Sequence, residues 1–321
     1  MNTVISAADT GLFSSLSYIY NKCADAPDVL YRPLGDTEFS RIFGFGNRYT
    51  FAAFSGGVPV GFASGSLGAK NVSYLSYVGV LPEYRRQGIA TKLLDTLEAA
   101  LRDAGAERTD TVFYDTASLP WIIPGTDNGH PCAPGVLTGS DSEGLLRARG
   151  YSEWCAQISY YLDLYDYEIP EKTAEKKKLL TEEGLSFGLY SPDKHKGLYE
   201  IFDKIGNPGW KNGVLSHPER PTVVCSDNNK DGLIVAFIGA LCPQKEGGGI
   251  RGNFCGVGTD PLYRGRGIAT VLFAEMCGYQ KECGAEFMSL YTGETMSARH
   301  VYEAAGCVPA ARWSNLRKIY N

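Results

Sequence analysis

The segment Val257-Gly-Thr-Asp-Pro-Leu-Tyr-Arg-Gly-Arg-Gly-Ile-Ala-Thr270 carries the strongest structural signal in this sequence. Its apolar, β-favouring start ends at Pro261, which cannot donate a hydrogen bond to a sheet and therefore marks the end of a strand. Two glycines follow, and Ile268 opens a run with the apolar density and length of a helix with a buried face. A strand, a glycine-rich turn and a helix start together predict a phosphate-binding loop, because the first amides of the helix point at the anion.

A second copy of this pattern lies 179 residues earlier, at Val78-Gly-Val-Leu-Pro-Glu-Tyr-Arg-Arg-Gln-Gly-Ile-Ala-Thr91. The positions that coincide with the later copy are Val78, Gly79, Pro82, Tyr84, Arg85, Gly88, Ile89, Ala90 and Thr91. A repeat of this length predicts a duplicated domain rather than a solenoid unit. Neither copy has the lysine and hydroxyl pair of nucleoside triphosphate loops or the GxGxxG of dinucleotide loops, so both classes are excluded.

Both copies resemble the signature of the GNAT superfamily of N-acetyltransferases, Arg/Gln-x-x-Gly-x-Gly/Ala after a strand. The signature is present as Arg85-x-x-Gly88-x-Ala90 and as Arg264-x-x-Gly267-x-Ala269. The resemblance implies an α/β (α+β) fold of two tandem GNAT-like domains, similar in architecture to duplicated chains such as the mycothiol synthases. Each domain is expected to have a mixed, mostly antiparallel sheet flanked by helices.

The same resemblance implies acetyl-CoA as the cofactor and a set of residues that bind it. The pyrophosphate is expected on the two loops, at Arg264, Gly265, Arg266, Gly267, Ile268, Ala269 and Thr270, and at Arg85, Arg86, Gln87, Gly88, Ile89, Ala90 and Thr91. The pantetheine arm is expected along the preceding strands, at Val257 and Thr259 and at Val78 and Val80. Backbone N–H groups there would also polarise the thioester carbonyl.

Acetyl transfer to an amine needs a positioned donor, a deprotonated amine and an acid for the leaving thiolate. In GNAT proteins a tyrosine on the helix after the fifth strand often serves as that acid, and Tyr302 matches its position. Thr295 stands where the family usually has an asparagine that contacts the cofactor. The first copy has Leu146 at the position of Tyr302, and leucine cannot donate a proton. Catalysis is therefore expected in the C-terminal domain.

The sequence does not identify the general base. Glu294 and Asp260 are the carboxylates nearest the expected cleft, although Asp260 also suits a turn or cap and a water relay would need neither. His300 lies two positions from Tyr302 and points to another face of the same helix. Cys255 is expected to be a buried, inert thiol.

Length and composition indicate a soluble protein of two domains. The 321 residues include 44% apolar and 21% charged side chains, and the net charge is −5. This charge gives no basic field for nucleic acid or an anionic membrane. No signal peptide or apolar run of membrane-spanning length is visible, and nine cysteines without a zinc-type spacing indicate reduced thiols. We therefore expect a cytoplasmic protein without a metal site.

The repeat predicts an N-terminal domain at 1–168, a charged linker at 169–184 and a C-terminal domain at 185–321. Expected strands or strand runs are 48–55, 58–64, 71–80, 111–114, 151–164, 222–226, 233–239, 252–257, 286–291 and 307–320; expected helices are 89–104, 142–149, 197–205, 268–277 and 298–305. A loop is expected from 206 to 221.

Gly150 and Gly306 end equivalent helices but lie 156 residues apart, so the first copy carries about 23 extra residues near 117–139. This insertion is expected to cover an acceptor site or pack against the second domain; a surface excursion is the alternative.

Two further interpretations are open at this point. The first copy keeps its loop but has Leu146, so it, or the whole protein, could be a non-catalytic acyl-CoA-binding or sensing module; catalysis in the N-terminal domain is the other alternative. The acceptor is expected to be an amine on a small molecule or peptide, since GNAT folds serve many acceptors. The chain is expected to be a monomer or a homodimer.

Overall fold

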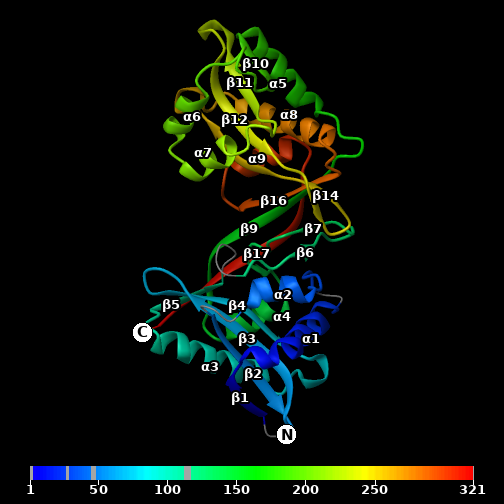
Figure 1. The fold of residues 1–321 in the computed structure, drawn as a ribbon, viewed down its shortest axis with the longest axis vertical. Coiled ribbons are helices and arrows are strands. Elements are labelled where there is room, and N and C mark those ends of the chain that lie inside the picture. Colours follow the sequence, from blue (N-terminus) through cyan, green and yellow to red (C-terminus); the bar gives the residue numbers. More distant parts are fainter. Residues whose placement is uncertain (1–2, 27–28, 45–47, 112–116, 321) are drawn as a thin grey trace. The chain divides into compact units, whose positions relative to one another are not determined.

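The computed structural model describes residues 3–26, 29–44, 48–111 and 117–320 (Figure 1). The chain folds into two compact units. The first comprises Met1–Thr126, His130–Ile158 and Ala311–Asn321, and the second comprises Asp127–Gly129 and Ser159–Ala310.

The first unit is built on a sheet in the order β1-β2-β3-β4-β5-β17, with β9 next to β17. These strands are β1 (Thr3–Ala7), β2 (Arg48–Ser55), β3 (Val58–Leu67), β4 (Val72–Val80), β5 (Arg108–Thr111), β9 (Ser152–Asp163) and β17 (Val308–Ile319). Of the pairs whose register is described, only β4–β5 is parallel. The expected mixed, mostly antiparallel sheet is confirmed, as is the β2–β3 hairpin around Gly56 and Gly57, both of which have positive φ. Residues 112–114 of the strand expected at 111–114 lie outside the described residues.

Helices cover both faces of this sheet. They are α1 (Phe13–Ala24), α2 (Asp36–Phe43), α3 (Ile89–Asp103) and α4 (Asp141–Ala148), with one-turn 3-10 helices at Thr10–Leu12 and Pro82–Tyr84. Helix α3 buries Leu93, Leu94, Leu97 and Leu101, whose spacing of three or four residues forms one face, against Ala63 of β3 and its neighbours. Phe62, next to Ala63, points to the other face and packs on Phe39 and Phe43 of α2.

The second unit contains a four-stranded antiparallel sheet, β10-β11-β12-β15, and a ladder in which β16 lies between β9 and β14, with β13 beyond β14. The strands are β10 (Leu185–Leu189), β11 (Val223–Asp227), β12 (Leu233–Leu241), β13 (Gln244–Glu246), β14 (Gly249–Gly252), β15 (Phe254–Thr259) and β16 (Phe287–Gly293). The helices are α5 (Glu171–Glu182), α6 (Leu198–Ile205), α7 (Pro208–Leu215), α8 (Ile268–Glu282) and α9 (Ala298–Ala304), with one-turn 3-10 helices at Asn228–Lys230 and Pro261–Tyr263.

Three segments differ from the sequence-based expectation. The loop expected at 206–221 contains α7, whose start is stabilised because Asn207 accepts a hydrogen bond from the Trp210 N–H and Pro208 occupies the first turn. The charged stretch expected as a linker is the regular helix α5. Its Leu180 is buried, and its Thr173 hydroxyl donates to the Ala304 carbonyl at 2.8 Å. The strand expected at 252–257 is interrupted at Asn253, between β14 and β15.

The last strand does not follow the predicted domain boundary. Residues 307–320 were expected to close the sheet of the C-terminal domain, yet Arg317–Ile319 pair antiparallel with Arg108–Asp110 of β5 in the first unit. The Arg317 guanidinium also donates two hydrogen bonds to the Asp110 carboxylate, at 2.7 and 2.8 Å. Non-local pairing of this kind leaves no local sequence signal.

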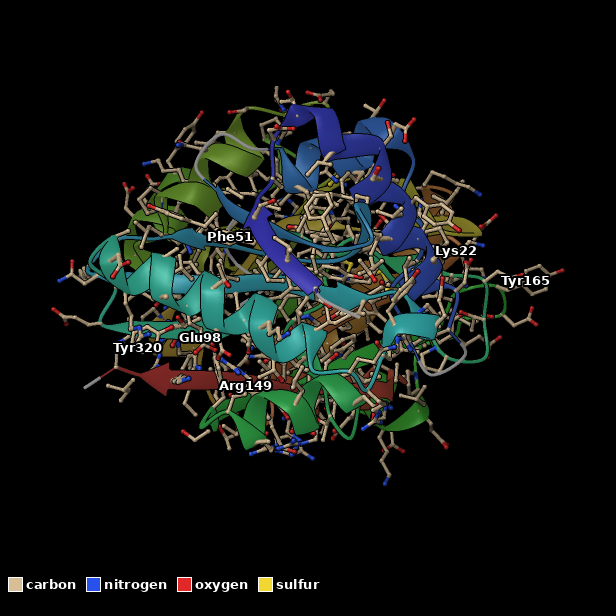
Figure 2. All side chains as sticks on the ribbon, turned by 90° about the horizontal axis from the view of Figure 1, so that it is seen from below. Lys22, Phe51, Glu98, Arg149, Tyr165 and Tyr320 are labelled. Carbon is tan, nitrogen blue, oxygen red and sulfur yellow. The ribbon has the colours of Figure 1, made fainter. Side chains whose placement is uncertain are left out.

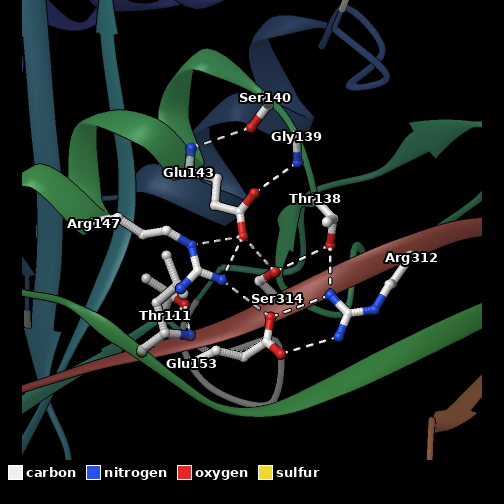
Figure 3. A network of polar contacts seen from close by, with 10 residues as sticks. Thr111, Thr138, Gly139, Ser140, Glu143, Arg147, Glu153, Arg312 and Ser314 are labelled. Atoms are coloured by element: carbon white, nitrogen blue, oxygen red, sulfur yellow. Dashed lines mark hydrogen bonds and ion pairs between the residues drawn. The ribbon is translucent and has the colours of Figure 1, made fainter.

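Two buried carboxylates fasten β17 to the helices of the first unit. Glu98 of α3, labelled with Arg149 in Figure 2, accepts hydrogen bonds from Arg149 and Tyr151, which follow α4. It also accepts one at 2.6 Å from Lys318, which lies on β17. Glu143 of α4 accepts from the Ser314 hydroxyl of β17 at 2.7 Å (Figure 3). The terminal strand is therefore held through side chains as well as through the sheet.

Glu143 is the centre of a larger network, which Figure 3 shows. One oxygen accepts from the Gly139 N–H at 2.6 Å, and the other from Arg147 and Ser314. Burial alone would raise the pKa of this carboxyl, but the hydrogen bonds from Gly139, Ser314 and Arg147 outweigh burial, so the net effect lowers it. The ionised carboxylate thus stabilises the folded first unit.

The insertion is integrated into the fold. Its short strands are β6 (Trp121–Ile122), β7 (Gly129–His130) and β8 (Val136–Leu137). The Ile122 N–H donates to the Leu30 carbonyl at 2.8 Å, and the Trp121 ring packs edge-on against Trp313 at 5.0 Å. Within the second unit, the Asp127 carbonyl accepts from the Gly248 N–H. A surface excursion is therefore the wrong description.

Substitutions in β17 are expected to destabilise the first unit. Leu316→Ala removes a side chain that is 0% exposed and should cost about 2–5 kcal/mol of unfolding free energy, whereas Ile319→Ala, at 69% exposure, should stay within about 0.5 kcal/mol. Chemical denaturation measures both values. Hydrogen exchange should show that the Leu316→Ala protein loses protection in α3 and β5. Loss confined to β11 and β12 would contradict the assignment of this strand.

The charge of Glu143 gives a second test, through pH. Folding lowers the pKa of Glu143, so its contribution to the stability of the folded state is present above the unfolded pKa of about 4.3. This contribution is lost as the pH falls through the lower pKa of the folded state. Glu143→Gln should cost about 1–3 kcal/mol at pH 7, and the difference from wild type should shrink below pH 4. Glu83→Gln, at an exposed position in the same unit, is the control. An equal loss at pH 7 and pH 3 would show that the charge is not responsible.

Candidate functional site

The first loop folds as a cradle at the start of α3. Gly88 caps the helix with φ +75° and without a side-chain hydrogen bond, and the first turn of the helix has no acidic residue. A Cβ at Gly88 would have no atom within 4 Å, so the backbone is open on this side. The N–H groups of the first helical turn lack intrahelical acceptors, and the helix dipole favours an anion there.

Arg85 and Arg86 have different roles in this loop. The Arg85 guanidinium donates to the carbonyl of Val80, the last residue of β4, at 3.0 Å, which fixes the turn between strand and helix. Arg86 has φ +61° and pairs at the surface with Asp141 of α4. The second copy has Gly265 at the Arg86 position, also with positive φ, so both loops use the left-handed conformation here.

A cavity of about 850 Å³ extends from this loop into the first unit. Its walls are the edge of β4, the loop with the start of α3, and α4 with the residues before it. Of the residues predicted from the sequence, Val78, Val80, Arg85, Arg86, Gly88, Ile89, Ala90 and Thr91 line it. Gln87 does not; its amide donates to the Glu83 carbonyl. The volume is in the range of small-molecule and cofactor sites.

The edge of β4 is the central wall of this cavity. The described pairing of β4 with β5 ends at Leu75 and Thr111, and from Ser76 to Val80 the strand lines the cavity. The pairing of β4 with β3 shifts register at the same point, between Ser64 and Gly65. Strand groups beyond such a bulge are directed away from the regular ladder. The α4 wall includes Gly139 and Ser140, which the Glu143 network holds in place.

The second loop has the same backbone form but different surroundings. Gly267 caps α8 with φ +85°, and Arg264 donates to the Thr259 carbonyl at 3.3 Å, as Arg85 does to Val80. A Cβ at Gly267, however, would lie 2.8 Å from Cε of Lys176 on α5. Arg266 forms an ion pair with Glu183, which follows α5. Helix α5 thus covers part of the second loop.

The other predicted residues of the second copy lie on β15, at the start of α8 and in the turn before α9. Val257 and Thr259 lie on β15 opposite Ile238 and Ala236 of β12. Ile268 is buried, while Ala269 and Thr270 are half-buried in the first turn of α8. Thr295 is exposed in the turn between β16 and α9.

The Tyr302 ring contacts two other aromatic rings. Its centroid lies 5.0 Å from that of Phe273 on α8 and 5.7 Å from that of Tyr160 on β9. Burial, together with the neighbouring Cys307 and Tyr160, raises the pKa of Tyr302 to about 12. Helix α9 therefore packs directly on α8, and the role of Tyr302 as the acid stays a prediction. In the first copy, Leu146 is 2% exposed and its side chain lines the cavity wall.

Of the base candidates of the second copy, Asp260 has its carboxylate engaged in other contacts. Asp260 accepts from Lys204 at 2.6 Å and from the Leu262 N–H; burial alone would raise its pKa, but these donors outweigh it and lower the value. The Glu294 carbonyl accepts from Arg299, and the exposed His300 lies near Glu303. Cys255 is half-buried on β15.

A group of titratable residues at the inner end of the cavity was not singled out from the sequence. It consists of Tyr20 and Cys23 on α1, Tyr31 in the segment before α2, and Tyr77 on β4. These residues come from three separate segments, and only the fold brings them together. A weak signal was available, because Tyr77 lies next to Val78 while the second copy has Gly256 at that position.

The described part of the chain contains neither a cluster of metal-binding side chains nor a helix suited to span a membrane. No cluster of three or more metal-binding side chains occurs among these residues. Their helices include none that is both long and apolar enough to cross a membrane.

Several solved structures have the same fold. A glucosamine N-acetyltransferase region of a fungal multi-domain GH3 β-N-acetylglucosaminidase has a TM-score of 0.69 and 16% identity, over 99% of this chain and 38% of that one. A GCN5-related N-acetyltransferase from Sphaerobacter thermophilus has a TM-score of 0.62 and 18% identity, over 99% and 95%. A tandem GNAT protein from the clavulanic acid biosynthesis pathway has a TM-score of 0.60 and 14% identity, over 99% and 98%. This chain therefore spans well under half of the fungal protein and nearly all of the other two.

The sequence comparisons agree with the tandem arrangement. None of the curated protein sequences matches this chain. The model of the acetyltransferase (GNAT) family matches it twice, at residues 16–120 and 180–307, which together make up most of its length. The two phosphate-type loops, each between a strand and a helix in its own copy of the fold, are those of the family. The chain belongs to the acetyltransferase (GNAT) family and carries two GNAT domains in tandem.

Proposed function

We propose that this protein transfers an acetyl group from acetyl-CoA to a primary amine and that the first unit holds the acetyl-CoA. The observation that carries the proposal is the cavity of about 850 Å³ that joins the first loop, the edge of β4 and α4. The expectation from Tyr302 was catalysis in the C-terminal domain. The contacts of the second copy favour the alternative, in which the N-terminal domain catalyses.

The residues of the first unit fit a CoA thioester. The cradle at Gly88 is open, and the uncapped start of α3 suits a pyrophosphate. The edge of β4 from Ser76 to Val80 offers backbone groups to an amide-bearing arm. Arg86 also lines the cavity, where its charge is paired with that of Asp141. A bound thioester supplies an already activated acyl group, so no covalent enzyme intermediate is needed.

The residues of the chain would position the bound thioester and polarise its carbonyl. The first turn of α3 fixes the phosphate end, and the β4 edge fixes the arm, so the carbonyl is presented at one end of the cavity. A β4 backbone N–H directed at that carbonyl would stabilise the negative charge that develops on its oxygen. Positioning of this kind supplies much of the rate in transfer between bound groups.

The surroundings of the second loop support a different use of the second copy. Lys176 lies against Gly267, Arg266 is paired with Glu183, and α9 packs on α8. The Lys176 side chain would have to move for a phosphate group to reach the Gly267 backbone from that side. We propose that the second domain serves mainly as a structural partner.

Glucosamine is the first acceptor to test, since the fungal protein of the same fold is described as a glucosamine N-acetyltransferase region.

A sensing role is the second candidate, because the first copy has Leu146 where the family usually has the tyrosine that donates a proton. Binding of acetyl-CoA without release of thiol in the presence of any amine of a broad panel would favour the sensing role.

A matched pair of variants tests which loop binds acetyl-CoA. Thr91→Glu and Thr270→Glu each place a carboxylate in the first turn of the helix after the loop, where a negative charge suits the helix dipole and folding should be preserved. Thr91→Glu should weaken acetyl-CoA binding by about tenfold or more, because the carboxylate repels the phosphates and competes for the amides. Thr270→Glu should leave the Kd unchanged. Isothermal titration calorimetry measures both.

The other outcomes are equally informative. Loss of binding in Thr270→Glu alone would return the site to the C-terminal domain. Full binding in both variants would show that neither loop holds the cofactor and would overturn the proposal.

A further inference from the structure

The inner end of the cavity in the first unit gathers three phenols and a thiol from separate segments. Two of the four have hydrogen-bond partners: Tyr20 donates to the Arg32 carbonyl at 3.3 Å, and the Cys23 thiol donates to the Val80 carbonyl at 3.4 Å. Tyr77 lies next to Cys23, which adds to the effect of burial in raising the pKa of Tyr77. The group therefore adjoins the end of β4, where Val80 lies.

Tyr31 is the fourth member, and its hydroxyl has no hydrogen bond to any residue in the described ranges. The Tyr31 hydroxyl is close to the other phenols. Burial is the main cause of the raised pKa of Tyr20 and of Tyr77, and the neighbouring Tyr31 hydroxyl adds to both, more weakly for Tyr77. A phenol without a partner in a cavity that contains the β4 edge is available to a bound molecule.

The backbone around Tyr31 is held by the insertion. Tyr31 forms an antiparallel bridge with Trp121, the Ile122 N–H donates to the Leu30 carbonyl, and the Arg32 N–H donates to the Pro120 carbonyl at 3.1 Å. The second copy has no counterpart of this insertion in its sequence. The residues that position Tyr31 are thus specific to the unit that contains the cavity.

Transfer from a thioester leaves a thiolate, and the first copy has Leu146 where the family usually has a tyrosine. We propose that Tyr31 takes over this task and donates a hydrogen bond, and then its proton, to the sulfur of CoA. This inference rests on the proposed function of the first unit. It assigns a proton donor from outside the position that the family motif marks.

The proton balance of the step closes without a further reactant. The amine nitrogen forms a bond to the thioester carbon, and the carbon–sulfur bond breaks with its electron pair left on sulfur. Sulfur takes the phenolic proton of Tyr31. The nitrogen loses one proton to water, and water returns a proton to the Tyr31 phenolate. Acetyl-CoA and amine thus give amide and CoA, with Tyr31 restored.

The ionisation of Tyr31 is suited to this task. Burial, with a smaller contribution from Cys132, raises the pKa of Tyr31 to about 12. The titratable groups around it among the described residues are Tyr20, Cys23, Tyr77 and Cys132. The phenol therefore stays protonated at pH 9.5, where an alkyl thiol with a pKa of about 8.5 is mostly ionised.

Binding measurements test this role without knowledge of the acceptor. CoA and desulfo-CoA, which has hydrogen in place of the thiol, are titrated into wild type and Tyr31→Phe at pH 6 and pH 9.5. Wild type should prefer CoA by about tenfold at pH 9.5, equivalent to about 1.4 kcal/mol, and much less at pH 6. Tyr31→Phe should lose this preference while binding desulfo-CoA as wild type does.

Tyr18→Phe is the control, since Tyr18 lies on α1 at an exposed position away from the cavity lining, and its preference should match that of wild type. Thermal melts establish that Tyr31→Phe is folded; because the strand contacts of Tyr31 use its backbone, Tm should change little. A full preference for CoA in folded Tyr31→Phe, or no preference in wild type, would overturn the role of Tyr31. Failure of wild type to bind either compound would instead overturn the proposed function.

Discussion

The Glu143 carboxylate accepts hydrogen bonds from three residues, and this interaction holds together the wall of the candidate site in the first unit. Gly139 belongs to the cavity wall, Arg147 to the next turn of α4, and Ser314 to the last strand of the chain. One buried charge therefore holds the cavity wall, the helix behind it and a strand from 171 residues further along the sequence. Because an unpaired buried carboxylate would be costly, these four groups are constrained to stay together.

The two copies show how one loop can be kept while its environment changes. Both loops use a left-handed glycine before the helix and an arginine that donates to the end of the preceding strand. In the first copy the loop opens onto a cavity, whereas in the second it lies against Lys176 and α5. The shared motif therefore determines the backbone geometry of the loop, whereas the residues that pack against the loop determine whether a ligand can reach it.

Elements with strong local signals were predictable from the sequence. The hairpin at Gly56 and Gly57, α3 and α8 after their glycine caps, and the short helices that end before Gly150 and Gly306 are all present in the structure. Helix α7 was missed because its glycines and asparagines suggest a loop, although Asn207 and Pro208 form a good helix start. In the candidate site, the loop residues followed from the motif, while the proposed proton donor Tyr31 has no local pattern that marks it.

The sequence by itself determined the duplication, the family and the two loops that carry the family motif, because each rests on short-range patterns of glycine, proline and apolar residues that constrain the backbone locally. Only the tertiary structure decided which unit takes the last strand, which loop is open and which phenols meet in the cavity. These depend on contacts such as Arg317 with Asp110 and Lys176 with Gly267. Such pairs are far apart in the chain, and the free energy that selects them comes from packing and buried polar contacts that no local pattern encodes.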